Sequence, residues 1–215
     1  MKRINIFVEG QTEEVFVQKV LYDHFQHLNI FLTPILIRTG RTGKGGVTSY
    51  GKIKKQINKK CQQDKSAFVS TMFDFYGLPD DFPGKSNLPV TNDPIQKVTY
   101  LEDEFRKDIS FSNFIPNLLI YEFEALLFTK IEIFEHWFDM RIVKKLSNVR
   151  DAFLTPEHIN DNPKTAPSKR ILKLCPGYKK VYHGTHIALD IGLDLIRNDC
   201  HHFNSWLNRL EKLVV

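Results

Sequence analysis

Hydrophobic positions change their spacing several times along the first half of the chain, and these changes predict alternating strands and helices. Short apolar runs rich in β-branched residues predict buried strands at residues 4–8, 30–37, 67–73 and 114–120. Between the runs, apolar residues recur every three or four positions, which is the spacing of a helix with one buried face. Pro34 lies inside the second run and predicts an edge or bulged strand there.

The helical segments differ in what surrounds their apolar stripes. One helix is predicted to begin at Thr12, where a hydroxyl that can cap the helix precedes two acids. A second carries lysines outside a stripe formed by Tyr50, Ile53, Ile57 and Cys61. A charged helix follows at 98–105, and from Ala125 onward the pattern is mainly helical, with a polar loop at 158–167 and an amphipathic helix at 203–213.

Strands that alternate with helices are typical of βαβ units, whose strands run parallel. We therefore expect an α/β fold, with a mostly parallel sheet of about four strands flanked by helices, over residues 1–130. Residues 131–215 are predicted to form a helical extension that packs on this core, so that both parts make one structural unit. A chain of 215 residues is long enough to bury a core without disulfides or metals.

The amino-acid composition excludes several classes of protein. Hydrophobic residues make up 42% and charged residues 26% of the chain, which excludes wholesale disorder. The three cysteines are odd in number and far apart, which argues against a secreted disulfide scaffold and predicts a reducing, cytoplasmic location. Residues 1–9 do not form a signal peptide, and no uncharged apolar run approaches the roughly 20 residues of a membrane span, so no membrane partner is expected.

The net charge of +5 is unevenly distributed. One segment holds eight basic residues and no acid, whereas the rest has 22 basic and 25 acidic residues. A basic segment of this kind suits a polyanion such as nucleic acid; the alternative is a solvated helix face. We call it the basic block, and it consists of Arg38, Arg41, Lys44, Lys52, Lys54, Lys55, Lys59 and Lys60.

Three of the predicted strands end at a carboxylate: Glu9, Asp74 and Glu122. Parallel sheets gather the carboxyl ends of their strands at one edge, where ligands usually bind. Carboxylates that meet there repel one another unless a cation joins them, and oxygen ligands suit Mg²⁺ or Mn²⁺. The alternative is that each acid merely faces water in a loop.

Further candidates lie beside these acids. Gly10 permits a tight turn, and Glu13 is predicted near Glu9, either as a functional acid or as a helix-start acid. The loop at 40–46 is not a Walker A motif, because Gly45 follows Lys44 where Ser or Thr is required. Residues 168–170 either begin a helix or hold a phosphate at the start of that helix.

Taken together, several motifs carry a family resemblance. Val8–Glu13 resembles the first motif of the Toprim fold, the metal-binding domain of topoisomerases, primases and OLD-type nucleases. The whole series is similar to a Toprim-like family designated DUF4276, which includes the nuclease effector of the PARIS anti-phage system. The remaining motifs of that series are Met72–Pro79, Glu122–Phe128, Thr165–Arg170 and His202–Trp206.

The resemblance implies a Mg²⁺-dependent phosphodiesterase that acts as a toxic effector in anti-phage defence. Glu9 matches the Toprim glutamate and Asp74 matches the first Asp of the Asp-x-Asp motif, but Tyr76 stands in place of the second. Glu122, with Glu124 behind it, is expected to replace the missing acid, and Asp80 and Asp81 are alternatives. RNA, above all tRNA, is favoured over DNA as substrate, and an ABC-type ATPase sensor is an implied partner; a homodimer is left open.

The favoured hypothesis assigns each candidate a role. Glu9, Asp74, Glu122 and Glu124 are the expected metal ligands, and Glu13 is a ligand or general base. The expected nucleic-acid contacts are Arg41, Lys44, Lys52, Lys55, Lys59, Lys169 and Arg170. Two other functions remain open: a nucleic-acid-binding module without catalysis, and a phosphatase with Asp74 as nucleophile.

Overall fold

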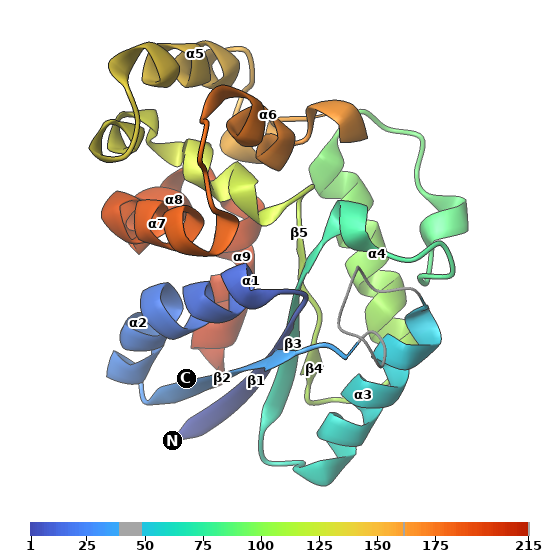
Figure 1. Cartoon of the computed structure of the whole chain (residues 1–215). Coiled ribbons are helices and arrows are strands. Elements are labelled where there is room, and N and C mark those ends of the chain that lie inside the picture. The colour runs from blue at the N-terminus through green and yellow to red at the C-terminus, as the bar shows by residue number, and fades with distance from the viewer. Residues whose placement is uncertain (39–48, 161, 215) are drawn as a thin grey trace.

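A parallel β-sheet lies at the centre of the molecule, with helices on both faces (Figure 1). The computed structural model describes residues 1–38, 49–160 and 162–214. The sheet has the order β2-β1-β3-β4, β5 also pairs with β3, and every pairing is parallel. This confirms the α/β class. The strands are β1 (Lys2–Val8), β2 (Ile30–Leu36), β3 (Phe68–Asp74), β4 (Phe114–Ile115) and β5 (Leu118–Leu119).

The helices fall into two groups, one on each face of the sheet. One face is covered by α3 (Tyr50–Gln63) and α4 (Pro94–Ile109). The other face is covered by the N-terminal helices and by the helical second half of the chain (Figure 1). That group contains α1 (Gln11–Phe16), α2 (Tyr22–His27), α5 (Met140–Asp151), α6 (Pro167–Leu174), α7 (Thr185–Ile191), α8 (Leu193–Asp199) and α9 (His201–Glu211).

The side chains of β1 alternate between two hydrophobic cores, so both faces of this strand are buried. Ile4, Ile6 and Val8 point into the core that the second half of the chain completes, whereas Phe7 points into the core beneath α3 and α4. Successive residues of a strand face opposite sides, so a strand buried on both faces is apolar throughout. The short run of residues 4–8 therefore has the composition that a central parallel strand requires.

The predicted strand at 114–120 is interrupted. β4 and β5 are separated by Pro116 and Asn117, because a proline has no backbone N–H to donate to the sheet. The side chain of Thr71 on β3 replaces the missing ladder: its hydroxyl donates to the carbonyl of Asn117 over 2.8 Å and accepts from the amide of Asn117 over 3.0 Å. The run remains at the sheet, but as two short strands.

The start of α1 also differs from the prediction. Gly10, not Thr12, is the residue that precedes the first turn. The carboxylate of Glu13 accepts the amide of Gly10 over 2.9 Å, so an acid caps the helix and Thr12 lies buried inside it. Glu13 is thereby held beside the end of β1.

Two expectations about single elements hold. β2 is an edge strand with Pro34 in it, and the predicted stripe of α3 is buried. The two halves of the chain share one core: the indole of Trp206 on α9 donates to the hydroxyl of Ser70 on the central strand β3 over 3.0 Å. In the described part of the chain, no helix is long and apolar enough to cross a membrane.

Candidate active site at the carboxyl edge of the sheet

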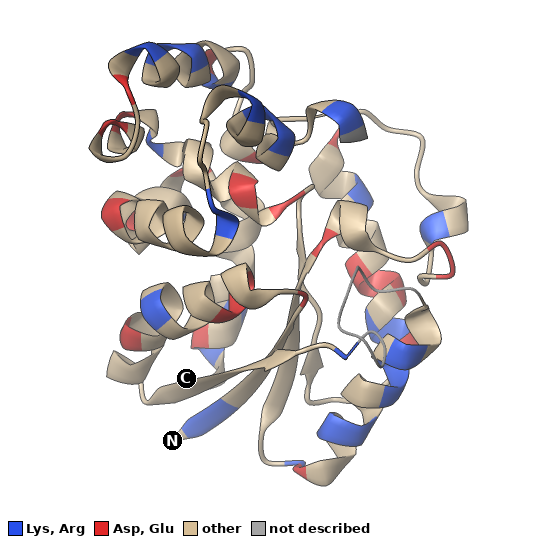
Figure 2. Ribbon diagram, viewed as in Figure 1, with Lys and Arg blue, Asp and Glu red and all other residues tan. Residues whose placement is uncertain are grey.

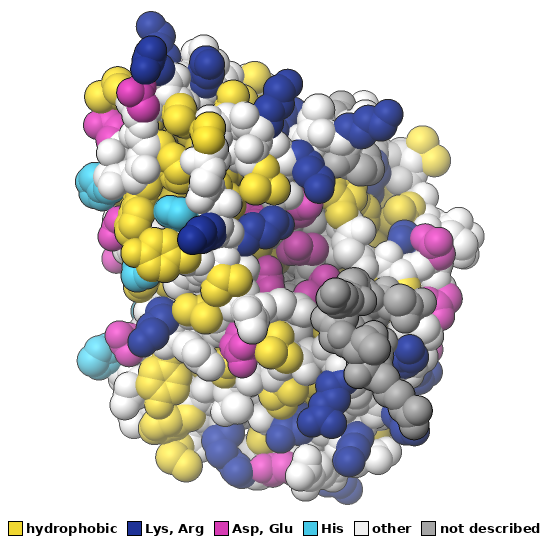
Figure 3. All heavy atoms as spheres, in the orientation of Figure 1, with side chains coloured by type: hydrophobic (Ala, Val, Ile, Leu, Met, Phe, Trp, Pro, Cys, Tyr) yellow, Lys and Arg dark blue, Asp and Glu magenta, His cyan; other side chains and the backbone are white. Residues whose placement is uncertain are grey.

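Five carboxylates gather beyond the carboxyl ends of the central strands; we call them the carboxylate cluster. Glu9 follows β1, Asp74 ends β3, and Glu122 follows β5, so that neighbouring strands deliver the three predicted acids to one edge. Glu13 comes from the first turn of α1, and Glu124 comes from the 3₁₀ segment η4 (Phe123–Thr129). Acidic segments meet at this edge in Figure 2, and the space-filling view shows acidic side chains in a central hollow (Figure 3).

Asp74 is the residue that links the strand ends. Its backbone amide donates to Oε1 of Glu9 over 3.0 Å, and its Oδ1 accepts the amide of Phe123 over 3.0 Å. Gly77 presses against the same glutamate, since a Cβ at that position would lie 2.6 Å from Oε2 of Glu9. A glycine is therefore required at position 77 for Glu9 to keep its place.

Burial is the main influence on the electrostatics of the cluster, and repulsion between neighbouring acids comes second at Glu9 and Asp74. Burial, and then the charge of Glu13, raises the pKa of Glu9 to about 8, although the amide of Asp74 opposes the shift. Burial and the charges of Glu9, Glu13, Glu124 and Glu122 raise the pKa of Asp74 well above its ordinary value. Burial also raises the pKa of Glu13 and of Glu124. The cluster thus holds more negative charge than its surroundings balance.

One cation reaches into the cluster from the second half of the chain. Lys180 begins the π-helical turn η8 (Lys180–Gly184), and its Nζ lies 3.0 Å from Oε1 of Glu124. Burial opposes its charge, but Glu124, Glu122 and Asp74 raise the pKa of this lysine. No sequence pattern indicated Lys180, because Lys179-Lys180 has neither spacing nor motif that distinguishes it from other surface lysines. Only the fold reveals its place.

The start of α6 closes another side of the cluster. The amide of Ser168 donates to Oε2 of Glu122 over 2.9 Å, so a helix N-terminus faces that carboxylate. Lys169 is exposed, whereas Nε of Arg170 donates to the carbonyl of Thr165 over 2.6 Å. Both basic side chains line a pocket of about 230 Å³ with Lys164 and Lys173. Lys169 and Arg170 directly follow Ser168 in the chain, and with Lys164 and Lys173 they form a basic rim.

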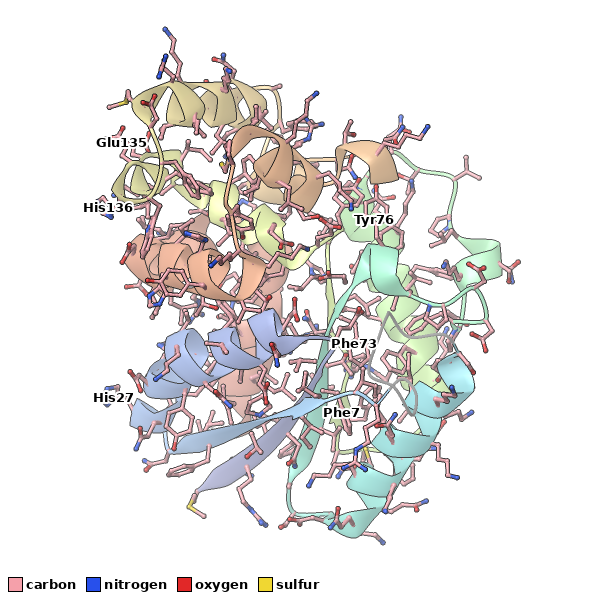
Figure 4. All side chains as sticks on the ribbon, viewed as in Figure 1. Phe7, His27, Phe73, Tyr76, Glu135 and His136 are labelled. Carbon is pink, nitrogen blue, oxygen red and sulfur yellow. The ribbon has the colours of Figure 1, made fainter. Side chains whose placement is uncertain are left out.

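Tyr76 does not supply the missing acid, and its side chain is held elsewhere. Its hydroxyl accepts from Nδ2 of Asn160 over 2.7 Å, and Figure 4 shows the residue beyond the carboxyl end of β3. Asp81 accepts the amide of Tyr50 at the start of α3, and Asp80 pairs with Lys85 over 3.0 Å. Neither aspartate is among the charges that raise the pKa of the acid ending β3. Glu122 and Glu124, by contrast, are among the acids that do raise the pKa of Asp74.

A hard divalent cation fits the chemistry of this donor set, since carboxylate oxygens are the ligands that Mg²⁺ and Mn²⁺ prefer. The excess of negative charge is the second point in favour, because a cation would relieve it. Within residues 1–38, 49–160 and 162–214, however, no three His, Cys, Asp or Glu side chains stand ready to hold a metal ion. Glu122 and Glu124 are turned towards an amide and a lysine instead. Metal binding therefore requires these side chains to turn inward.

The lysines of the basic block on α3 lie apart from the cluster. Lys52, Lys55 and Lys59 are exposed on α3, which covers the opposite face of the sheet from α1. Lys54 pairs with Asp108 over 2.9 Å. Arg41 and Lys44, two other predicted nucleic-acid contacts, lie outside the described residues. Lysines and arginines appear on the same side of the molecule as the acidic hollow in Figure 3, so one extended ligand can contact both.

Comparison with known families settles the relationship. Residues 8–211 match the family model described as "Domain of unknown function (DUF4276)". The chain belongs to the DUF4276 family. The match contains every residue of the carboxylate cluster and Lys180, so this site lies within the DUF4276 region.

Two further comparisons were made. A solved structure with 15% sequence identity, the C-terminal region of the Xanthomonas campestris pv. campestris OLD protein, aligns with a TM-score of 0.41 over 97% of this DUF4276 chain and 98% of that chain. No curated protein matches the sequence.

Proposed function

We propose that this DUF4276 protein is a metal-dependent nuclease whose active site is the carboxylate cluster. The observation that carries the proposal is the collection of five carboxylates at one edge of a parallel sheet, where burial raises the pKa of Glu9, Glu13, Asp74 and Glu124. Groups with strongly perturbed pKa values concentrate at functional sites. The resemblance of Val8–Glu13 and Met72–Pro79 to Toprim motifs supports the same reaction class.

Each residue of the cluster has a role in this proposal. Glu9, Asp74 and Glu122 would hold Mg²⁺ or Mn²⁺, with Glu124 behind them. When bound there, the cation neutralises charge on a phosphodiester and favours ionisation of a water molecule. Glu13 accepts the proton of the attacking water, a task that suits a carboxylate whose pKa is raised by burial.

Lys180 positions the phosphate. Its ammonium is the cation that the structure places against Glu124, and a half-exposed lysine is free to move from a carboxylate to a phosphate oxygen. A phosphodiester that enters the hollow brings its own negative charge, which the ammonium offsets as charge develops on the leaving oxygen. Lys169 and Arg170 at the basic rim, and Lys52, Lys55 and Lys59 on α3, hold the flanking backbone.

RNA is the proposed substrate, with tRNA first, and toxicity during phage infection is the proposed biological role. Both follow from the resemblance to the PARIS effector, as does an ABC-type ATPase that restrains the nuclease in the cytoplasm. In that case the isolated protein is the active form, and addition of the ATPase is expected to suppress its cleavage. A phosphatase with a nucleophilic Asp74 is less well supported, because a carboxyl with a raised pKa is a poor nucleophile.

The test is incubation of the purified protein with mixed tRNA and with plasmid DNA, in Mg²⁺, Mn²⁺ or EDTA, followed by gel electrophoresis. We expect cleavage of tRNA in either metal and none in EDTA. Mn²⁺ binding by calorimetry, compared between the wild type and Asp74→Asn, tests the site independently of turnover. A folded protein that binds RNA but cleaves nothing in any metal would instead support a binding module.

A further inference from the structure

A groove of about 670 Å³ adjoins the carboxylate cluster. It runs between the first helical segment of the chain, which contributes Val15 and Lys19, and the segment from η8 into α7, which contributes Tyr182 and Leu189. Lys180 lines this groove and also pairs with Glu124. The groove and the proposed active site therefore share a residue, and a ligand can occupy both at once.

The groove exposes apolar surface. Val181 is 40% exposed, Tyr182 is 53% exposed and Leu189 is 40% exposed. Figure 3 shows hydrophobic side chains and histidines on the α1–α7 side of the acidic hollow, with Lys or Arg side chains between the two. Adjacent exposed apolar side chains of this size are typical of a binding surface.

The ring of Tyr182 is fixed in place by other aromatic residues. Its centroid lies 4.7 Å from that of His186, 5.2 Å from that of His183 and 5.7 Å from that of Trp137, the last two at nearly perpendicular angles. Tyr182 is nevertheless 53% exposed, so a positioned aromatic ring offers surface to a ligand at small entropic cost on binding. A planar ligand can stack on such a ring.

The charges around the groove identify the kind of ligand. Lys19, Lys179 and Lys180 line it, and its lining contains no aspartate or glutamate among the described residues. An apolar peptide would use the tyrosine and leucine but would make no use of the charges of Lys19 and Lys179. A nucleotide uses both, because its base stacks and its phosphates pair with the lysines. The volume of the groove lies within the range of roughly 300–1,000 Å³ that is usual for ligand pockets.

We propose that this groove binds one unpaired base of a single-stranded nucleic acid, stacked on Tyr182, while Lys19 and Lys179 contact the phosphates beside it. The proposal rests on the nuclease function above, because Lys180 would then place the next phosphate over the carboxylate cluster. A base within a duplex cannot enter the groove, so the substrate is a loop or another single-stranded segment.

The test measures binding in EDTA, so that cleavage plays no part. Short RNA oligonucleotides that carry 2-aminopurine report stacking through quenching, and anisotropy reports affinity. Tyr182→Ala should weaken single-strand binding about 5- to 100-fold, whereas Tyr182→Phe should keep it, since the ring is what stacks. Leu154→Ala, an exposed apolar residue outside the groove, is the matched control and should change nothing.

The outcomes separate this proposal from the nuclease proposal. Quenching that depends on the Tyr182 ring, with weaker binding of a duplex of the same sequence, supports the groove whether or not the protein cleaves RNA. Unchanged single-strand affinity in Tyr182→Ala overturns the groove, even if cleavage in Mg²⁺ is intact. Equal affinity for duplex and single strand also overturns it.

Discussion

Two groups of buried acids in this protein differ in how well cations and hydrogen-bond donors balance their charge. In the interior, Glu102 is only 4% exposed, yet its carboxylate is fully partnered by His202 at 3.1 Å, Arg209 at 3.2 Å and the amide of Leu118 at 2.9 Å. At the edge of the sheet, the carboxylate cluster has five acids and one close lysine, Lys180.

This difference in partners distinguishes acids that stabilise the fold from acids of the proposed active site. Burial costs free energy for any charge, and Glu102 recovers it through hydrogen bonds that also tie α4 to α9. Its neighbour Glu157 does the same by accepting two amides at the start of α9. In the carboxylate cluster, burial and neighbouring acids raise the pKa of Glu9 and Asp74, and a cation bound among them would offset that cost.

The largest effect should come from the cluster. Glu9→Gln and Asp74→Asn each remove a proposed metal ligand while keeping the side-chain shape, so RNA cleavage should fall by about 1,000-fold or more. Both variants should fold and be more stable than the wild type in EDTA, because repulsion is relieved. Cleavage assays and thermal melts measure the two effects. A wild-type cleavage rate in either variant would exclude the cluster as the active site.

The partnered acid should respond in the opposite way. Glu102→Ala leaves His202, Arg209 and the amide of Leu118 without their acceptor, so the free energy of unfolding should fall by about 3–5 kcal/mol. Glu102→Gln keeps an acceptor and should lose less. Urea denaturation checks both. If Glu102→Ala proved as stable as the wild type, the distinction between the two groups of acids would fail.

The pH dependence of stability provides a third comparison. The folded-state pKa of Glu9 is about 8 against an ordinary 4.5, so the folded chain holds a proton that the unfolded chain releases between those values. Stability in EDTA should therefore be greatest near and below about pH 5 for this group and decline as the pH rises towards 8. Glu9→Gln should flatten that decline by on the order of 2 kcal/mol, a discounted share of the full shift.

Added Mg²⁺ sharpens the same measurement. A cation that binds the deprotonated cluster should stabilise the wild type increasingly from pH 6 to pH 8, with little effect on Asp74→Asn. Thermal melts across pH with EDTA or Mg²⁺ provide both curves. Equal Mg²⁺ stabilisation of the wild type and Asp74→Asn would place the cation elsewhere.

We expect the smallest effect from the exposed lysines of α3, which are not part of either group of residues in this comparison. Replacing Lys52, Lys55 and Lys59 with glutamine should weaken RNA binding for all sequences and lower the slope of log affinity against log salt by about 0.7 per lost contact. Lys144 and Lys145 on α5, changed in the same way, are the control. An unchanged slope would mean that the nucleic acid follows another surface.

Local pattern was sufficient to predict the sheet and three of the acids. Residues 4–8 and 67–73 are mostly apolar because their strands are covered on both faces, and a parallel strand that ends in an acid places that acid at a known edge. The break at Pro116 was missed because Thr71, a residue distant in sequence, makes the compensating hydrogen bonds. Thr12 was misread because the acid at Glu13 caps the helix instead.

The remainder of the site depends on contacts between distant segments. Lys180 lies 56 positions after the glutamate with which it pairs, so no local spacing predicts the contact. The same holds for the amide of Ser168 on Glu122. Periodicity likewise could not predict the partners of Glu102, because α4 and α9 meet only in the folded protein.

The bond between Trp206 and Ser70, which spans 136 positions, has a consequence for synthesis on the ribosome. β3 and its carboxylates are made long before α9 and Lys180 emerge, at a translation speed of roughly 5–20 residues per second. During that interval the apolar face of the sheet is uncovered and open to chaperones. Under the proposed function, the nascent chain carries acids but neither the lysine nor the stacking tyrosine. Under that proposal, cleavage of RNA can begin only after residues 180–182 have been made and have folded against the sheet.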